Sequence, residues 1–362
     1  MTDGSHNPPQ GIDNSEYMML SSKNVFDDKI TFDEPRFLSE EDFKKEHKRT
    51  KVSVGDVLLT IVGTVGRTAV VDEDTPLFAL QRSVAVLHPK TDVCLPRFLM
   101  YALRGKRTFI ENRAKGVAQK GIYLNDVSDI DVQVPDISTQ EMIINLLDKV
   151  DTIVKFRKEE LLALDNLIKA RFVELFGDPI KNPKGWEVVT IGDIVKEVKY
   201  GTSKPAVEGG KYPYLRMNNL TSDGHLDLND LKYIDISEDE IEKCVVRKGD
   251  VLFNRTNSIE LIGKTAVFDL PDDMVIAGYI IRVRLNERML PEVLSQYMNL
   301  EALKDILRSM AKGAVNQANI NAQELQSIKV YLPDMGLQKK FIEMKEQVDK
   351  SKVTKQIDSP IS

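Results

Sequence analysis

The sequence predicts an α+β protein built from two duplicated, mixed α/β domains that are joined by a pair of long antiparallel helices. The phrase Val-x-x-Gly-Asp-Val-Leu occurs at Val52–Leu58 and again at Val246–Leu252. Other matches keep a nearly constant offset of about 197 residues, and a long stretch without glycine or proline separates the copies. A repeat of this length greatly exceeds that of solenoids, so the pattern indicates whole duplicated domains related by a pseudo-two-fold axis.

The composition is that of an ordinary globular chain. It has 362 residues, of which 42% are apolar and 29% charged, with a net charge of −6. This length allows two domains with separate cores. No apolar run is long enough to span a bilayer, and Met1 precedes polar residues rather than a signal peptide, so no membrane partner is expected. The cysteines Cys94 and Cys244 suggest no disulfide framework, which favours a reduced, cytoplasmic location.

Each copy is expected to consist mainly of short strands. The runs "DVLLTIVG" and "TAVVD" in the first copy correspond to "DVLFN" and "TAVFDL" in the second. The segments "DIDVQVP" and "SIKVYLP" alternate with a period of two and end at proline. The first copy, residues 1–136, has no counterpart of Trp186–Lys199 and is expected to lack an opening strand. The second copy is expected to occupy residues 181–334.

Two helices are predicted, one after each copy. Residues 139–176 contain no glycine or proline, and apolar residues recur there every seven positions, as in a helix that pairs with another helix. Gly177 provides a stop, so this helix is placed in residues 137–180, and a shorter one in residues 335–362. An alternative is a single long helix that packs on a globular core. The predicted seam consists of Leu147, Val150, Val154, Leu161, Leu164, Ile168, Phe341, Met344 and Val348.

Four features together resemble one known family. They are "LFGDPIKNPKGWEVVTIGDI" at Leu175–Ile194, the two Gly-Asp-Val-Leu phrases, "TDGSHNPP" at Thr2–Pro9, and the Val-x-x-Pro…Gln entry into both helices. The chain resembles the specificity (S) subunits of type I restriction–modification systems. That resemblance implies that each copy is a target recognition domain reading one half of a split site in double-stranded DNA.

The resemblance also implies the partners. The helices would act as a spacer and as a docking surface for methyltransferase (M) subunits, and restriction (R) subunits would join the assembly. S-adenosylmethionine, ATP and Mg are then expected on the partner subunits and no cofactor on this chain, which would have no catalytic residue of its own.

Candidate DNA contacts are polar or basic side chains in the matched loops of the two copies. Lys and Arg favour phosphate contact, whereas Asn, Gln, Arg, Ser and Thr can bond base edges in the major groove. For the first copy the candidates are Ser5, His6, Arg67, Gln81, Arg82, Lys115, Gln119 and Lys120. For the second copy they are Thr202, Ser203, Lys204, Arg216, Asn218, Asn254, Arg255, Thr256, Asn257, Lys264, Tyr279, Lys312, Asn316 and Gln317.

Two rival interpretations are the specificity region of a fused restriction–methyltransferase enzyme and a coiled-coil adaptor without DNA readout. Motifs for catalysis are incomplete. Asn7-Pro8-Pro9 is followed by Gln10 where amino-methyltransferases have an aromatic residue, and Ser258–Thr265 lacks the first glycine of a phosphate-binding loop. The four histidines show no spacing typical of metal ligands. The adaptor leaves the duplicated domains unexplained.

Overall fold

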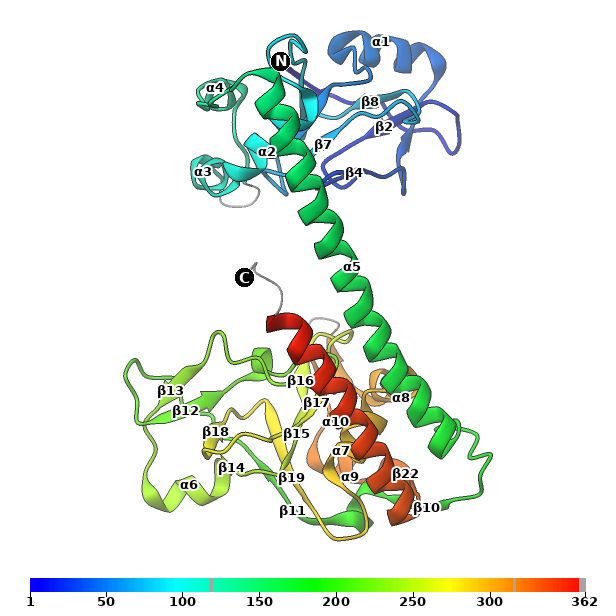
Figure 1. Ribbon diagram of the computed structural model, residues 1–362. Coiled ribbons are helices and arrows are strands. Elements are labelled where there is room, and N and C mark those ends of the chain that lie inside the picture. Colours follow the sequence, from blue (N-terminus) through cyan, green and yellow to red (C-terminus); the bar gives the residue numbers. More distant parts are fainter. Residues whose placement is uncertain (117–119, 315–316, 358–362) are drawn as a thin grey trace. The chain divides into compact units, whose positions relative to one another are not determined.

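The computed structural model describes residues 1–116, 120–314 and 317–357 (Figure 1). The chain divides into two compact units, Met1–Lys155 (unit 1) and Phe156–Ser362 (unit 2). Both units mix helices and short strands, which confirms the α+β class.

Unit 1 begins with strands and ends with helices. Its elements are β1 (Thr2–Asp3), β2 (Met18–Leu20), β3 (Val25–Phe26), β4 (Lys29–Ile30), β5 (Arg36–Phe37), α1 (Glu40–Thr50), β6 (Val57–Thr60), β7 (Thr68–Val70), β8 (Phe78–Leu80), β9 (Val84–Leu87), α2 (Pro96–Gly105), α3 (Arg107–Arg113), α4 (Leu124–Ser128) and the first part of α5 (Ile137–Phe176).

Unit 2 contains the rest of α5 and a longer series of elements. They are β10 (Glu187–Thr190), η1 (Ile191–Ile194), β11 (Val195–Tyr200), β12 (Tyr212–Leu215), η2 (Met217–Asn219), β13 (Lys232–Ile234), α6 (Glu238–Cys244), β14 (Val245–Val246), β15 (Val251–Asn254), β16 (Thr256–Asn257), β17 (Thr265–Val267), β18 (Met274–Ile276), β19 (Ile280–Leu285), α7 (Pro291–Met298), α8 (Glu301–Met310), β20 (Lys312–Ala314), β21 (Gln317–Asn319), α9 (Ala322–Gln326), β22 (Lys329–Leu332) and α10 (Met335–Ile357).

The sheets show that the sequence repeat is a repeat of topology. Unit 1 has an antiparallel sheet in the order β1-β9-β6-β7, and unit 2 has β11-β19-β15-β17 in the same arrangement. In each unit a second sheet contains a parallel pair, β2–β8 in unit 1 and β12–β18 in unit 2. The strand β6 lies between two parts of the core, with Leu58 in one cluster and Leu59 in another. Both faces of β6 are therefore buried, and its sequence is a continuous apolar run instead of an alternation of apolar and polar residues.

Matched glycines explain one part of the repeat. A Cβ on Gly4 would lie 2.2 Å from the carbonyl oxygen of Leu80, and a Cβ on Gly201 would lie 2.2 Å from that of Ile276. The chain thus passes so close to the neighbouring strand at these two positions that only glycine fits.

The two units differ in one two-stranded sheet and in the length of one edge strand. In unit 2, β10 pairs antiparallel with β22. Residues 131–134, which match β22 in the sequence repeat, form no strand although the structure describes them. The strand β1 has two residues, whereas its counterpart β11 has six. Unit 1 therefore has less strand pairing at the edge where the sequence predicts a missing strand.

The same glutamine contacts hold the start of both long helices. The Gln140 side chain donates to the carbonyl oxygens of Val93 and Pro135, and its own oxygen accepts from the backbone N–H of Leu95. Gln338 makes three corresponding bonds, to Arg288, Pro333 and Leu290. Both side chains are fully buried. A single side chain thereby fixes each helix to the loop that precedes α2 or α7.

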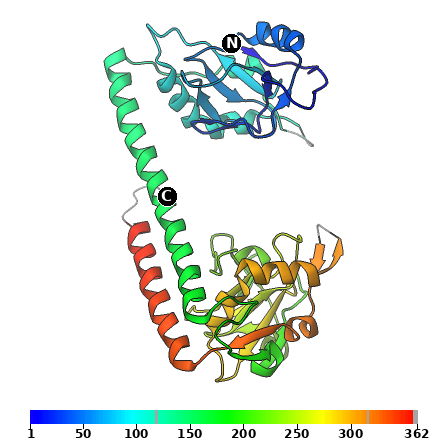
Figure 2. The same ribbon diagram turned by 90° about the vertical axis from the view of Figure 1, so that its right-hand side faces the viewer.

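Within unit 2, α10 packs antiparallel against the C-terminal part of α5 (Figure 2). The Phe341 ring meets those of Phe172 and Phe176 edge-on, with centroids 5.2 and 5.7 Å apart. Farther along, Lys352 on α10 forms an ion pair with Asp165. Since residue numbers rise along one helix as they fall along the other, the two helices run in opposite directions.

The predicted seam residues lie in different surroundings. Ile168, Phe341 and Val348 are buried in the main core of unit 2, and Leu164 and Met344 pack against that core. Leu147 packs against a unit 1 core cluster that includes Val57 and Met100. The remaining seam residues are half-buried: Val150, Val154 and Leu161.

Candidate nucleic-acid interface

The predicted recognition loops close through the same backbone hydrogen bonds in both units. In the β6–β7 loop, the Gly66 N–H donates to Thr60 O and the Thr60 N–H donates to Arg67 O. In the longer loop of unit 2, the Gly263 N–H donates to Asn254 O, and the Asn254 N–H donates to Lys264 O. Gly66 and Gly263 have φ angles of +92° and +75°, a conformation that favours glycine.

A hairpin lies beside each loop. In unit 1, Lys115 pairs with Gly121, which also pairs with Val62 of the loop. In unit 2, β20 and β21 form the hairpin, and β21 pairs with β16 in the loop. Gly116 and Gly313 occupy matching positions in these hairpins and both have positive φ angles, +122° and +114°. Each unit therefore presents a surface made of one loop and one hairpin.

Arg255 lies between β15 and β16 in the loop of unit 2. Its guanidinium donates to Asn319 Oδ1 at 2.8 Å and lies 5.0 Å from the centroid of the Tyr200 ring. Its backbone N–H donates to Tyr279 O, and Tyr279 itself is exposed. Arg255 is thus held by three segments that are distant in sequence, and its Nε lacks a hydrogen-bond partner.

Four candidates lie below the surface of their units and have little area that could contact DNA directly. They are Ser5, Asn254, Thr256 and Lys264, each with less than a tenth of its surface exposed. Asn254 Nδ2 donates to the carbonyl oxygens of Thr256 and Tyr279. Lys264 Nζ donates to Met217 O, and burial lowers the pKa of its ammonium group. Because the side chains of Asn254 and Lys264 are already bonded inside unit 2, they support its loop.

The other candidates of unit 2 lie at or near its surface. Lys204 pairs with Glu240, Arg216 with Asp230 and Lys312 with Glu324. Asn257 donates to Asn254 and accepts from the Ser258 N–H. Thr202 is half-buried, and four candidates are exposed: Ser203, Asn218, Tyr279 and Gln317. Asn316 lies outside the described residues.

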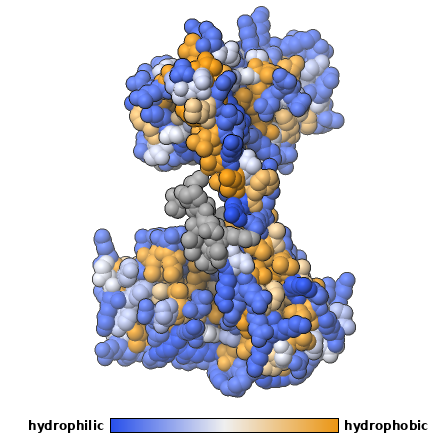
Figure 3. Space-filling view, viewed as in Figure 1, coloured by the Kyte–Doolittle hydropathy of each residue, from blue (hydrophilic) through white to orange (hydrophobic). Residues whose placement is uncertain are grey.

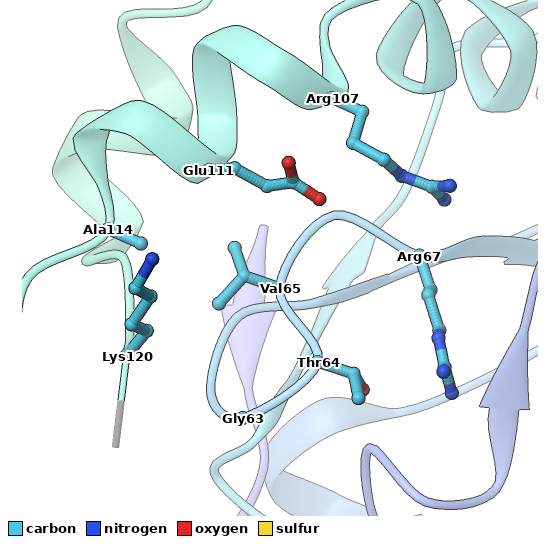
Figure 4. A pocket seen from close by; sticks show the side chains of 8 residues that line it. All are labelled: Gly63, Thr64, Val65, Arg67, Arg107, Glu111, Ala114 and Lys120. Carbon is cyan, nitrogen blue, oxygen red and sulfur yellow. The ribbon is translucent and has the colours of Figure 1, made fainter. Parts of the chain in front are cut away.

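In unit 1 the loop and its neighbours surround a pocket of about 350 Å³ (Figure 4). Arg67 and Lys120 line it, as do Arg107 and Glu111 from α3, and the loop residues Gly63–Val65. The Arg67 guanidinium lies 4.9 Å from the centroid of the Phe26 ring. Arg107 and Glu111 lie in the basic run between Arg104 and Lys120, which the sequence suggests for phosphate contact, but neither is among the candidate DNA contacts given individually above. The signal that could have found Arg107 is its offset from Lys304, which equals that of Gly66 from Gly263.

The remaining unit 1 candidates are spread around this pocket and the parallel strand pair. His6 is exposed and its Nε2 lies 2.6 Å from an Asp3 carboxylate oxygen. Arg82 and Lys115 are exposed, and Gln81 is half-buried. Gln119 lies outside the described residues.

Three further features concern metal ions, membranes and thiols. Among residues 1–116, 120–314 and 317–357, no group of three or more His, Cys, Asp or Glu side chains could hold a metal ion. No described helix combines the length and apolar character that crossing a membrane requires. Cys94 and Cys244 are both free thiols, and burial raises the pKa of each.

The duplicated topology and the two loop–hairpin surfaces define a protein built from two related copies of one domain. The sequence model of one protein family, the type I restriction modification DNA specificity domain, matches residues 14–165 and 183–361. The chain belongs to this family.

Similar proteins carry the same description. The specificity subunit of the type I restriction enzyme EcoKI from Escherichia coli is 24% identical over 235 residues, covering 60% of this chain and 50% of its own. That of EcoBI, also from E. coli, is 31% identical over 137 residues, covering 36% of this chain and 29% of its own. The chain therefore spans half or less of the length of these curated relatives.

Solved structures share the fold. The S subunit of a type I restriction–modification system from M. genitalium matches with a TM-score of 0.52 at 14% identity, covering 99% of this chain and 88% of that one. A chain from a structure on the assembly and conformational transition of a type I R-M system gives a TM-score of 0.51 at 19% identity, covering 85% and 78%. These matches confirm the predicted fold.

Proposed function

We propose that the chain is the non-catalytic DNA-recognition subunit of a type I restriction–modification complex, in which each unit reads one half of a two-part site. The observation that carries this proposal is the duplicated loop–hairpin surface. Two such surfaces in one chain could contact two half-sites, and their separation would depend on the connecting helix.

The chemistry of each surface fits DNA. Unit 1 brings Arg67 and Lys120 to the lining of one pocket, so that cations gather locally on a chain whose net charge is −6. Cations of this kind suit phosphate contact, which supplies affinity. Unit 2 offers Arg255 supported by Asn319 and Tyr200, a fixed guanidinium of the type that bonds guanine edges. The two surfaces differ in loop length and side chains, as expected if they read different sequences.

The outer face of α5 supports the docking of methyltransferase subunits. In unit 1, Met142, Leu146 and Ile153 are each more than half exposed, and Figure 3 shows hydrophobic side chains along this helix. In unit 2, Phe156 and Leu162 are also more than half exposed on α5. Apolar side chains in such numbers along one helix are typical of a surface that another protein covers. Restriction subunits would join the resulting assembly, and S-adenosylmethionine, ATP and Mg would bind to the partner subunits.

The test is a binding-site selection with the full chain and its methyltransferase subunits, followed by titrations in increasing salt. We expect a two-part motif with a spacer of constant length, and affinity that falls steeply as salt rises. Assembly with the methyltransferase but no sequence preference would favour the adaptor instead. Methyl transfer by the chain alone would favour the fused enzyme.

A further inference from the structure

In both units, a basic side chain from a helix donates a hydrogen bond to a glycine carbonyl oxygen of the recognition loop. In unit 2, Lys304 on α8 donates from Nζ to the carbonyl oxygen of Gly263. In unit 1, Arg107 on α3 donates to the carbonyl oxygen of Gly66 from Nε at 3.2 Å and from Nη2 at 3.1 Å. The two basic residues are separated by the same sequence offset as the two glycines. This contact is therefore duplicated, although its chemistry changes from an ammonium to a guanidinium.

The helix and the glycine are in close contact in both cases. A Cβ on Gly263 would lie 2.4 Å from Cδ1 of Leu307, which is on the same helix as Lys304. A Cβ on Gly66 would lie 3.2 Å from Cγ of Arg107 itself. The loop thus turns at a glycine in order to present its carbonyl oxygen to the basic group.

The cost of burying Lys304 indicates that this contact is important. Only 9% of its surface is exposed, and it has no hydrogen bond to a carboxylate among those that the structure describes. Its acceptors are Gly263 O and Asn299 Oδ1, the latter at 2.8 Å. An ammonium placed in such a site is expensive, so most buried positions would hold an apolar side chain.

Hydrogen bonds connect the glycine that accepts from the basic side chain to the backbone beside an arginine of the candidate interface. Gly263, held by Lys304, donates to Asn254 O, and Asn254 immediately precedes Arg255. In unit 1, Gly66 donates to Thr60 O, and Thr60 Oγ1 accepts from the Arg67 N–H at 2.9 Å. In each unit, therefore, the basic side chain holds the backbone that carries an arginine of the candidate interface.

We propose that Lys304 and Arg107 are matched positioning residues that fix the recognition loops of their own units. Neither needs to contact DNA. Loss of one should disturb the half-site read by its unit and leave the other half-site intact. This inference rests on the proposed function for its DNA consequence, but not for its effect on the loop.

The experiment compares Lys304→Met and Arg107→Met in the full chain. Methionine keeps much of the length and removes the donor. We expect amide hydrogen exchange to rise at least tenfold at Gly263 and Asn254 in the first variant, and at Gly66 and Thr60 in the second. In site selections with methyltransferase subunits, each variant should lose base preference in one half-site only, and not in the same one.

Matched controls lie on the same helices. Arg308→Met removes a half-buried cation of α8 that pairs with Glu301 and Asp305, and Arg113→Met removes an exposed cation from α3. Neither side chain has a hydrogen bond to a loop glycine among the described residues. Both controls should keep wild-type exchange and preference. Arg107→Lys, which retains a donor, should restore most of the preference lost in Arg107→Met.

Each outcome decides the matter. Unchanged loop exchange in both methionine variants overturns the proposal, as does a uniform loss of affinity without altered preference, since that is the effect of a structural contact alone. If Lys304→Met fails to fold, Arg107→Met carries the test, because the Arg107 side chain is 32% exposed. If the wild-type chain shows no DNA preference, the proposed function fails, and loop exchange still decides whether Lys304 and Arg107 fix their loops.

Discussion

The two units show one topology supported to different extents. In unit 2, Phe341 and Val348 of α10 are buried, and Met344 packs against the main core. The matching positions on α5 in unit 1 are Ile143 and Val150, which are half-buried, and Leu146, which is 63% exposed. Matching sequence thus has different roles: these positions stabilise unit 2 from within, whereas in unit 1 they remain available to a partner.

The largest effect should come from breaking this asymmetry in the core. Phe341→Ala removes a fully buried ring that contacts Phe172 and Phe176, and should cost about 3–5 kcal/mol of unit 2 stability. Trp186, the single tryptophan, lies in unit 2 and donates to Phe176 O, so its fluorescence follows unfolding there. The matched variant Ile143→Ala should cost unit 1 about 1 kcal/mol or less, because its side chain is only half-buried. Equal losses in both units would contradict the comparison.

Loss of Gln140 and loss of Gln338 should destabilise their units to a similar extent, although the helices α5 and α10 are buried to different extents. Gln140→Ala and Gln338→Ala each leave one backbone N–H and two carbonyl groups without their side-chain partner. Each should lose about 2–3 kcal/mol in its own unit, because three hydrogen bonds to a fully buried side chain are lost. Hydrogen exchange of α2 and α7 would measure the two losses separately. A loss in one unit alone would mean that the shared bonds do not have a shared role.

How far the sequence predicts this molecule depends on whether a feature leaves a repeated signal. The duplicated domains, the α5 stop at Gly177 and the Gly116–Gly313 match follow from offsets and spacing alone. The burial of Asn254, Thr256 and Lys264 does not, because polar loop residues look alike in sequence whether they face solvent or their own backbone. The role of Lys304 was missed for a related reason: a lysine in an amphipathic helix is usually solvated.

The ammonium of Lys304 should also give unit 2 a pH dependence of stability that unit 1 lacks. Burial first, and then the charges of Arg308 and Lys264, lower the pKa of Lys304 to about 7, against an opposing effect of Glu301. A lysine whose folded pKa is depressed binds fewer protons when folded, so stability rises with pH above about 7 and up to the unfolded value near 10.5. Its counterpart in unit 1, Arg107, is an arginine and not a lysine.

Unit 2 of the wild type should therefore gain stability relative to Lys304→Met between pH 7 and 9. The gain has an upper bound of about 2.5 kcal/mol, at about 1.36 kcal/mol per pH unit. Urea unfolding followed by Trp186 fluorescence at both pH values measures it. In unit 1, the difference in unfolding free energy between wild type and Arg107→Met should not depend on pH. If the difference between wild type and Lys304→Met in unit 2 is the same at pH 7 and pH 9, Lys304 does not titrate in this window.

The smallest expected effect concerns base reading and leaves stability unchanged. Arg255→Ala should cost roughly 1–2 kcal/mol for the preferred second half-site, in the lower part of the usual range, because Asn319 already engages one guanidinium nitrogen. Preference should relax in that half-site only.

Lys120→Ala, which removes an exposed cation beside the unit 1 pocket, should instead weaken binding to all sequences alike and reduce the salt slope by about one. The two variants serve as controls for each other, since misfolding would weaken binding without changing either preference or salt dependence selectively. Site selection on both variants, with titrations at several salt concentrations, measures these differences. An unchanged second half-site in Arg255→Ala, with lower affinity throughout, would make Arg255 a phosphate contact and move base reading to other residues of unit 2.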